Sequence, residues 1–388
     1  MFIRSLRVKN WRNFREASAQ FREITYIIGA NATGKSNFLD VFRFLRDVAK
    51  PQGGGLQKAI LDRGGLAKLR CLHARRPPFV EIDIRILENL DGLPQGWQYE
   101  LFFKSEGAGA NRPVIAVERV TRIKGKEKEL ILQRPDKEDE ADPERLTQTA
   151  IEQIQSNAKF RELTDFFSGI TYLHLVPQLL KYGEFIGGRH LESDPFGQAF
   201  LARVASSKDK VRDSRLKRIQ KALGDAIPQF AELRFARDES GHPHLEAKYT
   251  HYRPNAGWQR EDQFSDGTLR LIALFWLLME GDTMLLLEEP ELSLDEAIVR
   301  QLPRLLEKVR RSSKRRQRQI IISTHSQAML DNSGIDGRGV LRLERTNEGT
   351  VVHEPSEIDL EAMRAGLSPA DVIMSKSHPK GAIQMELL

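Results

Sequence analysis

A glycine-bearing segment near the start of the chain has the residue types and spacing of a phosphate-binding loop. Residues 29–36 read GANATGKS and fit the pattern G-x-x-x-x-G-K-[ST] at every fixed position. The glycines let the backbone curl so that its N–H groups face one centre, and a following helix adds the positive end of its dipole. Lys35 would reach the β- and γ-phosphates, and the Ser36 hydroxyl would bind Mg²⁺. A chance glycine-rich turn is disfavoured, because a strand pattern precedes the loop and a helix pattern follows it.

Carboxylates follow an apolar run far downstream. Residues 284–287 read MLLL and are followed by Glu288, Glu289, Pro290 and Glu291. A buried strand that ends in acids places them at the carboxyl edge of a parallel sheet, beside the phosphate loop. Glu288 is then expected to bind Mg²⁺ through water, and Glu289 to polarise an attacking water. The alternative is a solvated strand end, which the wholly apolar residues before it disfavour.

Three further short segments adjoin the expected helices and strands and could contribute to a nucleotide site. FSDGT at 264–268 precedes an apolar helix, SLD at 293–295 follows the carboxylates, and STHS at 323–326 ends the next strand. Ser265 can cap its helix, which would offer a second helix N-terminus to a phosphate. His325 could hydrogen-bond the γ-phosphate or the attacking water. Singly, these segments are explained equally well by a helix cap, a turn and a surface histidine.

The elements that must position these residues alternate between strands and helices. Helical spacing runs from Ser36 to about Pro51, is common over 146–224, and returns at 269–279 and 296–309. An antiparallel patch is expected from 79–87, 97–104, 113–123 and 129–133. The other expected strands are 2–8, 21–28, 170–176, 231–236, 245–252, 284–287, 319–323, 340–343 and 350–353. From about Ser368 there is little periodicity, and that stretch is expected to be loosely attached.

Composition excludes several classes of protein. The chain has 388 residues, 40% hydrophobic and 29% charged, which suits two or three globular domains and excludes fibrous or wholly disordered chains. The longest apolar run, 271–279, is too short for a bilayer span, and the first residues lack a signal peptide's core. A cytoplasmic protein without a membrane partner is expected. The single cysteine, Cys71, is expected to pack in the core.

Basic residues outnumber acidic ones by 60 to 54, which permits contact with nucleic acid but does not demonstrate it. Basic residues are most concentrated between Arg304 and Arg318, where Glu307 is the single acidic residue. This basic segment is either a solvated helix end that runs into a loop or a surface for phosphate backbones.

Jointly, these residues resemble the ATP-binding-cassette (ABC) ATPases, and within them the SMC, RecF and OLD-like branch with its small AAA-type relatives. Residues 29–36 resemble Walker A, 264–270 the signature motif, 285–290 Walker B, 293–295 the D-loop, and His325 the switch histidine. Residues 6–14 (LRVKNWRNF) resemble the branch's N-terminal strand and turn. The resemblance covers 1–60 and 240–345, and the intervening third only by position. The chain departs from the family in having Glu288 for the usual Asp, a signature reading SDGT, and no coiled coil or TOPRIM acids.

The resemblance implies an α/β fold: the P-loop head of an ABC ATPase, with a mixed sheet, an antiparallel β subdomain and a helical insertion. The expected divisions are 1–135 (first ATPase lobe), 136–240 (insertion), 241–355 (second lobe) and 356–388 (extension). It also implies that Glu289, His325 and Lys35 are catalytic and that Ser36, Glu288 and Gln178 hold Mg²⁺. The residues implied to bind ATP are Arg12, Asn31, Gly34, Lys35, Ser36, Asn37, Ser265, Gly267 and Asp295.

Family architecture further implies a homodimer that forms on ATP binding and reopens on hydrolysis, serving DNA maintenance or anti-phage defence with DNA as a partner. The alternative is a regulatory ATPase subunit that controls a separately encoded effector protein without binding DNA. A transporter ATPase is less favoured, because Walker A comes early and the middle third is long. A small-molecule kinase would have no use for Ser265 or His325.

Overall fold

The chain divides into two compact units, which are described separately. The computed structural model describes residues 1–74, 78–107, 112–183, 194–250, 257–281, 283–312 and 318–377. The first unit comprises Met1–Ile170, Thr283–Leu286 and Arg318–Leu388, and the second comprises Thr171–Asp282 and Leu287–Gln317. Among the described residues, no helix has the length and apolar character needed to span a bilayer.

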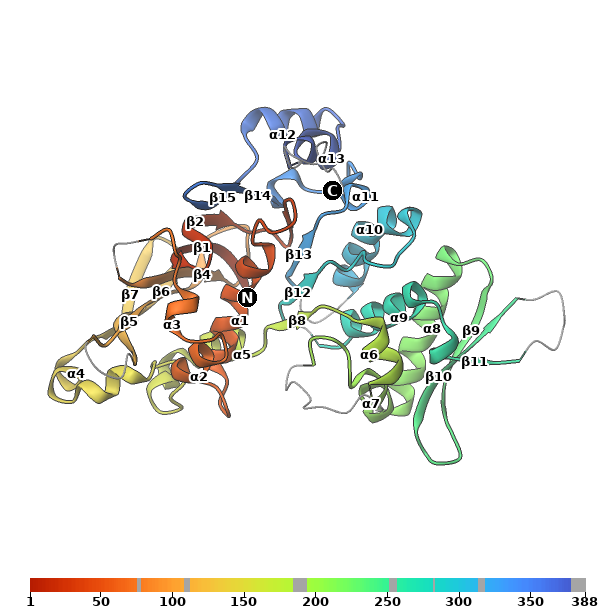
Figure 1. Cartoon of the computed structure of the whole chain (residues 1–388), viewed down its shortest axis with the longest axis horizontal. Helices are drawn as coiled ribbons and strands as arrows, with labels where there is room; N and C mark the ends of the chain where they lie inside the picture. Colours follow the sequence, from red (N-terminus) through yellow and green to blue (C-terminus); the bar gives the residue numbers. More distant parts are fainter. Residues whose placement is uncertain are drawn as a thin grey trace, which may run out of the picture. The chain divides into compact units, whose positions relative to one another are not determined.

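An antiparallel sheet of six strands dominates the first unit (Figure 1). Its order is β2-β1-β4-β5-β6-β7, which confirms the expected antiparallel patch. Alternate residues of β4 are buried, and the rings of Trp11 and Phe103 pack on Phe44 of helix α1 at 5.2 and 5.5 Å. The strands are β1 (Phe2–Trp11), β2 (Phe14–Gln20), β4 (Val80–Leu87), β5 (Gln95–Ser105), β6 (Pro113–Lys124) and β7 (Glu127–Arg134).

A second sheet in this unit carries the phosphate loop. β3 (Ile24–Ile28) pairs in parallel with both β13 (Ile320–Thr324) and β14 (Val340–Thr346), and β15 (Gly349–His353) pairs antiparallel with β14. β12 (Leu285–Glu288) lies beside β13, because the Leu285 N–H donates to the Gln319 carbonyl at 2.9 Å. The strand expected at 21–28 is shorter than predicted, because β3 begins only at Ile24. β2 was not predicted. A central parallel strand is buried on both faces, as β3 is from Thr25 to Ile28.

Helices complete the first unit. They are α1 (Lys35–Ala49), α2 (Leu56–Leu61), α3 (Leu66–Leu69), α4 (Lys137–Ala141), α5 (Arg161–Ser168), α11 (Gln327–Leu330), α12 (Glu357–Arg364) and α13 (Pro369–Val372), with short 3-10 turns η1 (Pro143–Thr147), η2 (Ser156–Phe160), η4 (Gly337–Gly339) and η5 (Met374–Ser377). The stretch after Ser368 was expected to be loosely attached, which is wrong as far as residue 377. Ser368 begins a capping box, and Ala370 and Ile373 are buried. Cys71 is buried, as predicted.

The second unit is built around an apolar helix, α9 (Asp266–Met279), whose residues from Thr268 to Leu278 are all buried. α8 (Asp209–Ala226) packs against α9 and against a small antiparallel sheet of order β11-β10-β9. Its strands are β9 (Phe230–Arg237), β10 (Pro243–Tyr249) and β11 (Gln259–Arg260). The remaining elements are β8 (Thr171–Leu173), α6 (Pro177–Tyr182), α7 (Phe200–Ser206), η3 (Glu261–Gln263) and α10 (Glu296–Ser312). The mostly helical character expected for 146–224 is confirmed, with β8 as the predicted interruption.

Candidate nucleotide-binding site

The loop between β3 and α1 has the backbone that a phosphate cradle requires. Gly34 has φ 97°, and a Cβ there would lie 2.1 Å from Asn13 Nδ2. A Cβ on Gly29 would lie 2.8 Å from the Leu343 carbonyl oxygen. Only glycine fits either position. The 15-residue helix α1 begins directly after the loop, with no capping side chain and no acid in its first turn. The positive end of its dipole is therefore directed at whatever lies in the loop.

Lys35 lies across this loop. Its side chain is buried, and Nζ donates to the Gly29 carbonyl at 2.9 Å and to the Ala30 carbonyl at 3.4 Å. Ser36 and Asn31 are exposed beside it. The helix start, the loop backbone and an ammonium group thus converge, which is the chemistry that binds a polyphosphate.

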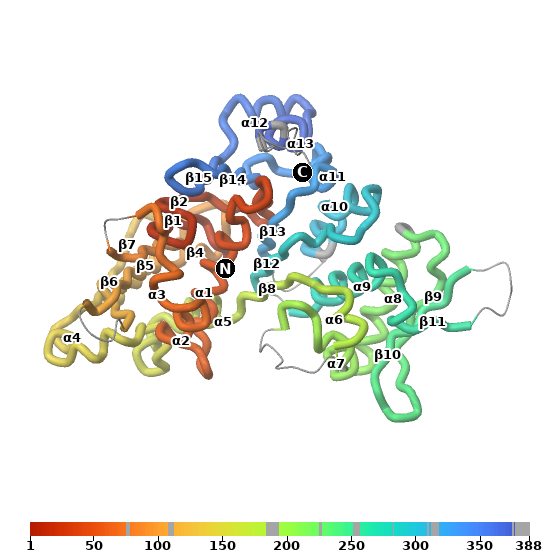
Figure 2. Tube along the Cα trace, in the orientation of Figure 1, coloured from red at the N-terminus to blue at the C-terminus, as the bar shows by residue number. Residues whose placement is uncertain are grey.

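Asn13, in the turn between β1 and β2, fixes the loop from outside. Its Nδ2 donates to the Thr33 carbonyl at 2.9 Å and to Thr350 Oγ1 at 2.6 Å, and its Oδ1 accepts from Asn37 Nδ2 at 2.8 Å. Thr350 Oγ1 also donates to the Thr33 carbonyl at 2.8 Å. The first and last hairpins of this unit therefore lie side by side at the loop (Figure 2). The sequence offered only one clue to Asn13, its place beside Arg12 in the expected turn.

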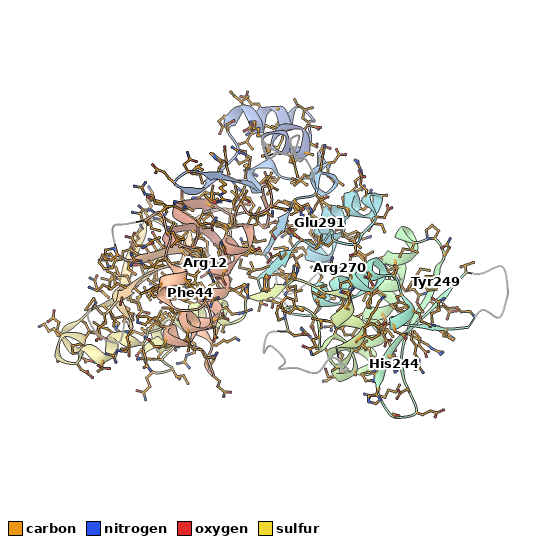
Figure 3. All side chains as sticks on the ribbon, in the orientation of Figure 1. Arg12, Phe44, His244, Tyr249, Arg270 and Glu291 are labelled. Carbon is orange, nitrogen blue, oxygen red and sulfur yellow. The ribbon has the colours of Figure 1, made fainter. Side chains whose placement is uncertain are left out.

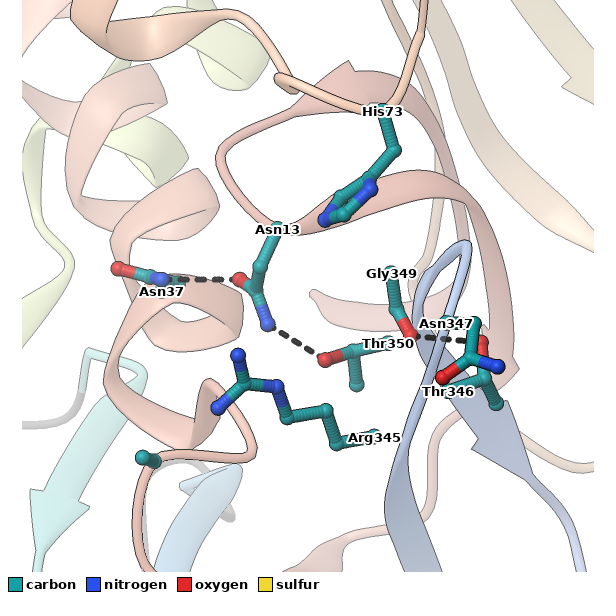
Figure 4. A pocket seen from close by; sticks show the side chains of 9 residues that line it. Asn13, Asn37, His73, Arg345, Thr346, Asn347, Gly349 and Thr350 are labelled. Atoms are coloured by element: carbon teal, nitrogen blue, oxygen red, sulfur yellow. Dashed lines mark hydrogen bonds between the residues drawn. The ribbon is translucent and has the colours of Figure 1, made fainter.

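A polar pocket of about 440 Å³ adjoins the loop (Figure 4). Arg345 extends toward its interior from the β14–β15 hairpin, and His73 faces it from the opposite side. A pocket of this size is within the range that holds small-molecule ligands. Neither Arg345 nor His73 belongs to a motif, so no sequence signal pointed to them. The lining residues are Asn13, Ala32, Asn37, His73, Arg345, Thr346, Asn347, Gly349 and Thr350.

Arg12 is held by α1 rather than by this pocket. Its Nη2 donates to Asp40 Oδ2 at 3.0 Å, and Arg63 lies 2.9 Å from the other oxygen of the same carboxylate. Burial alone would raise the pKa of Asp40, but the charge and hydrogen bonds of Arg63, with Arg43 and Arg12, hold it below its usual value. Arg12 is not among the residues that line the pocket, and its contact with nucleotide stays a prediction.

In the second unit, the two expected carboxylates lie at the end of an apolar strand and directly after it. Glu288 is the last residue of β12, and its Oε2 accepts from the Tyr172 hydroxyl at 2.5 Å. His174 Nδ1 lies 3.3 Å from the Glu288 carbonyl oxygen. Glu289 has φ 45°, a strained conformation that is common at functional sites. Tyr172 was not predicted, although the alternation at 170–176 places it on the same side of its strand as His174.

The signature-like segment packs on the loop that follows these acids. Ser265 is exposed, and its Oγ accepts from the Thr268 N–H at 3.1 Å, which confirms the predicted helix cap. A Cβ on Gly267 would lie 2.5 Å from the Ser293 carbonyl oxygen. Arg270, which is labelled in Figure 3, donates to the Leu292 carbonyl at 2.5 Å and also to the Leu175 carbonyl. Arg270 therefore fastens the loop 289–295 to α9 and to the segment after β8.

The remaining predicted site residues are also placed. Asp295 Oδ1 accepts from the Ala297 N–H at 2.8 Å at the start of α10. Gln178 is exposed on α6, where its Nε2 lies 3.4 Å from Asp266 Oδ2. His325 is exposed just after β13, in the first unit. The structure thus brings Asn31, Gly34, Lys35, Ser36 and Asn37 together in the first unit, and links Ser265, Gly267, Gln178 and the loop 289–295 in the second.

The donor atoms assigned to Mg²⁺ suit a hard cation. Ser36, Glu288 and Gln178 offer a hydroxyl, a carboxylate and an amide oxygen, the ligand types that Mg²⁺ prefers. The described residues hold no group of three or more His, Cys, Asp or Glu side chains fit for a metal. Mg²⁺ typically takes only one or two carboxylates and fills its shell with water and phosphate, so it accepts each of these donor types. Ser36 belongs to the first unit and Glu288 and Gln178 to the second, and their joint role stays a prediction.

The basic segment is partly engaged within the chain. Arg310 and Arg311 lie 2.8 and 2.5 Å from Glu307, and Arg318 donates to the Thr283 carbonyl. Lys314, Arg315 and Arg316 lie outside the described residues. Contact between this segment and DNA stays a prediction.

Comparison with known proteins places this geometry in context. A family model described as "AAA domain, putative AbiEii toxin, Type IV TA system" matches residues 24–331. No curated protein matches the chain. Among solved structures, an SMC head bound to the C-terminal winged-helix domain of ScpA is similar at 15% identity, covering 92% of this chain and 99% of that one, with a TM-score of 0.53.

Two Smc heads from Pyrococcus are similar as well. The Smc head of Pyrococcus furiosus, bound to the C-terminal domain of ScpA, has 15% identity, coverages of 94% and 98%, and a TM-score of 0.51. The Smc head of Pyrococcus yayanosii, with a coiled coil and joint, has 14% identity, coverages of 97% and 99%, and a TM-score of 0.50. These likenesses show the fold, and they confirm the expected mixed α/β architecture of an SMC-like ATPase head.

Proposed function

The chain belongs to the family of AAA domains described as "putative AbiEii toxin, Type IV TA system", and on this basis we propose that it is an ATPase that dimerises when it binds ATP with Mg²⁺. The observation that carries the proposal is the loop between β3 and α1. Its two glycines admit no side chain, Lys35 lies across it, and an uncapped helix starts from it. The adjoining polar pocket is the proposed place for the nucleoside.

Each predicted residue has a proposed task. Ser36, Glu288 and Gln178 are the residues assigned to Mg²⁺, which when bound neutralises the charge of the phosphates. Glu289 accepts a proton from the attacking water, and His325 hydrogen-bonds the γ-phosphate or that water. Asn31, Gly34, Lys35 and Asn37 hold the phosphates, and Arg12 lies near the nucleotide.

Dimerisation follows from the charge of the ligand. A triphosphate is a polyanion, and a second helix N-terminus from another protomer satisfies it better than one alone. Ser265 is exposed at such an N-terminus, on a helix of 14 residues, and Gly267 of that helix and Asp295 belong to the same unit. We assign these residues to the nucleotide of the opposite protomer. Hydrolysis then weakens the contact and lets the dimer reopen.

The proposed biological setting is DNA maintenance or anti-phage defence. The family description, which names type IV toxin–antitoxin systems, supports the defence role. A second candidate is a regulatory subunit that controls a separate effector protein. It is favoured by the SMC heads of the same fold that were solved in complexes with a domain of ScpA.

Glu289→Gln and Lys35→Ala test the ATPase proposal. With ATP and Mg²⁺, Glu289→Gln should accumulate as a dimer and lose about 10²–10³-fold in hydrolysis rate, because the general base is absent. Lys35→Ala should remain monomeric and bind no ATP. The measurements are light scattering after sizing chromatography and phosphate release. Lys58→Ala and Glu296→Gln, exposed residues in ordinary ion pairs, are the matched controls. A Glu289→Gln protein that stays monomeric and hydrolyses ATP normally would refute the proposal.

Two further measurements separate the settings. Binding to a short DNA duplex that falls steeply between 50 and 200 mM salt would support a DNA partner, because neutralised phosphates release counterions. Purification from the native host with a stoichiometric second protein, and no such DNA binding, would support the regulatory subunit.

A further inference from the structure

Strand β10 contacts the signature-like segment and the turn η3 just before it. At η3, His244 Nδ1 lies 2.8 Å from Glu261 Oε1, and the Leu245 N–H donates to Glu261 Oε2 at 2.9 Å. In the segment itself, Tyr249 shares a side-chain hydrogen bond with Thr268. One strand therefore holds the residues on either side of Ser265. Figure 3 labels both His244 and Tyr249 in this unit.

A chain of hydroxyl groups leads from β10 to Ser265. Thr268 Oγ1 lies 2.8 Å from Ser265 Oγ, and the Thr268 N–H donates to the same oxygen at 3.1 Å. With the bond between Tyr249 and Thr268, three side chains form one network. The Tyr249 ring is itself fixed by an edge-to-face contact with Phe230 at 5.5 Å. Linked hydrogen bonds of this kind hold a side chain in one rotamer, so the half-buried tyrosine sets the direction of an exposed serine hydroxyl.

In the contact between β10 and Glu261, His244 supplies the positive charge that pairs with the Glu261 carboxylate. The Glu261 side chain is only 4% exposed, and a carboxylate so buried is stable only when it is paired. His244 Nε2 also lies 3.4 Å from Asp238 Oδ2, whose other neighbours include His242, and Arg260 lies nearby. Burial pulls the pKa of His244 down and Arg260 opposes its charge, but the bonds to Glu261 and Asp238 prevail and raise that pKa above its usual value.

We propose that Tyr249 and His244 are positioning residues, which orient Ser265 toward the γ-phosphate of the nucleotide bound by the opposite protomer. The inference rests on the proposed ATP-dependent dimer. Neither side chain touches the nucleotide; Tyr249 acts through Thr268, and His244 acts through Glu261.

The proposal gives dimerisation a pH dependence with a definite sign. His244 has a raised pKa, so the support from its charge is complete below about pH 6.5, its unperturbed value. That support is lost as the pH rises through the folded-state value. The ATP-bound dimer should therefore weaken on the alkaline side of neutrality.

Tyr249→Phe is the first test, made in the Glu289→Gln background so that ATP is not consumed. The dimer dissociation constant, from sedimentation velocity with ATP and Mg²⁺, should rise about 5–10-fold, the loss expected for one hydrogen bond. ATP affinity of the monomer should be unchanged, because the phosphate loop is untouched. Tyr182→Phe, which alters an exposed tyrosine of the same unit, is the matched control. An unchanged dimer constant in Tyr249→Phe would overturn the proposal.

His244→Gln is the second test. Between pH 6 and 9, the Glu289→Gln dimer should weaken with rising pH. The dimer of the His244→Gln derivative should be weak throughout this range, and its dissociation constant should change less with pH. His242→Gln removes an exposed histidine that contacts only the Asp238 side of this group, and it should keep the parent profile. If His244→Gln keeps it too, the proposed role of His244 is wrong.

Hydrogen exchange tests this inference separately from the proposed ATP-dependent dimerisation on which it rests. In the monomer without ATP, Tyr249→Phe should speed exchange of the Thr268 amide, which donates to Ser265 Oγ, and Tyr182→Phe should not. If the Glu289→Gln protein never dimerises, the proposed function fails, and this exchange measurement still decides whether Tyr249 orders the segment. If it dimerises and both variants behave as the parent does, only the present inference fails.

Discussion

Several residues of the candidate site adopt backbone angles that their side chains disfavour. Arg12, Ala32, Glu289 and Ser293 have φ angles of 52°, 63°, 45° and 64°. Each such residue costs roughly 1–3 kcal/mol unless the surroundings impose the conformation. All four lie in segments that were assigned to nucleotide chemistry from the sequence. The strained backbone therefore occurs in segments where nucleotide binding would require an exact direction of the backbone or of a side chain.

Asn13 offers a test at this scale. Asn13→Ala removes the donor to Thr33 and Thr350 and the acceptor for Asn37, so the phosphate loop loses its outer support. ATP affinity measured by calorimetry should fall about tenfold, and the free energy of unfolding should fall by roughly 1–2 kcal/mol. Asn347→Ala, on the rim of the same pocket, is the comparison. Equal ATP affinity in the two variants would show that Asn13 does not support the loop.

At the scale of elements, most strands and helices were predictable because their apolar residues recur at the right period. β2 was missed because FREASAQ has few apolar residues, and it forms a strand by pairing with β1 from Ser5 to Trp11. The site residues Tyr172, His73 and Arg345 were not predicted, for another reason. Each reaches the site through a pairing between distant parts of the chain, which local periodicity does not encode.

The junction of α9 with the loop after β12 can be tested by Gly267→Ala. The new Cβ would lie 2.5 Å from the Ser293 carbonyl oxygen, so either helix or loop must shift. We expect the free energy of unfolding in urea to fall by roughly 1–3 kcal/mol, the usual range for overpacking. Gly224→Ala in α8 is the control, because its nearest atom, the Phe230 carbonyl oxygen, would lie 3.8 Å away. That change should stabilise the helix by roughly 0.5–1 kcal/mol. Similar losses in both variants would contradict the close contact at Gly267.

Glu152 makes the start of α2 sensitive to pH. It accepts from the Leu56 N–H at 2.6 Å and from Thr149 Oγ1 at 3.2 Å, and burial raises its pKa to about 7. A raised acid pKa means that stability is complete below the unfolded-state value and is lost as the pH rises through the folded-state value. Glu152→Gln should therefore become more stable relative to the parent between about pH 5 and 7.5, by roughly 3 kcal/mol in total. Urea unfolding at several pH values measures this difference, and a constant difference would disprove it.

At the scale of the whole molecule, the predicted site residues are distributed between two compact units. The phosphate loop and His325 belong to the first unit, and the acids of 288–289 and the signature-like segment belong to the second. The sequence predicted both groups from motif order alone. It could not predict where one unit ends, because β12 itself changes unit between Leu286 and Leu287.

Nucleotide should stabilise the chain by mass action. At an ATP concentration about 100 times Kd, the gain is about 2.7 kcal/mol, which for a unit of this size corresponds to a Tm increase of roughly 5–11 °C. Differential scanning fluorimetry with ATP and Mg²⁺ measures the shift. Lys35→Ala should show none, whereas Lys58→Ala should shift as the parent does. A shift of equal size in Lys35→Ala would mean that ATP binds elsewhere.

The link between Asn13 and Thr350 has a consequence for biosynthesis. The strand before the phosphate loop gains both of its neighbours only from residues 320–324 and 340–342, and Thr33 gains its hydroxyl partner only from residue 350. Until those residues are translated, a nascent chain on the ribosome carries the whole GANATGKS loop without its two neighbouring strands and without Thr350. Competence to capture a nucleotide should thus arrive only after residue 350 has been made, so products terminated before that point would not compete for the cell's ATP.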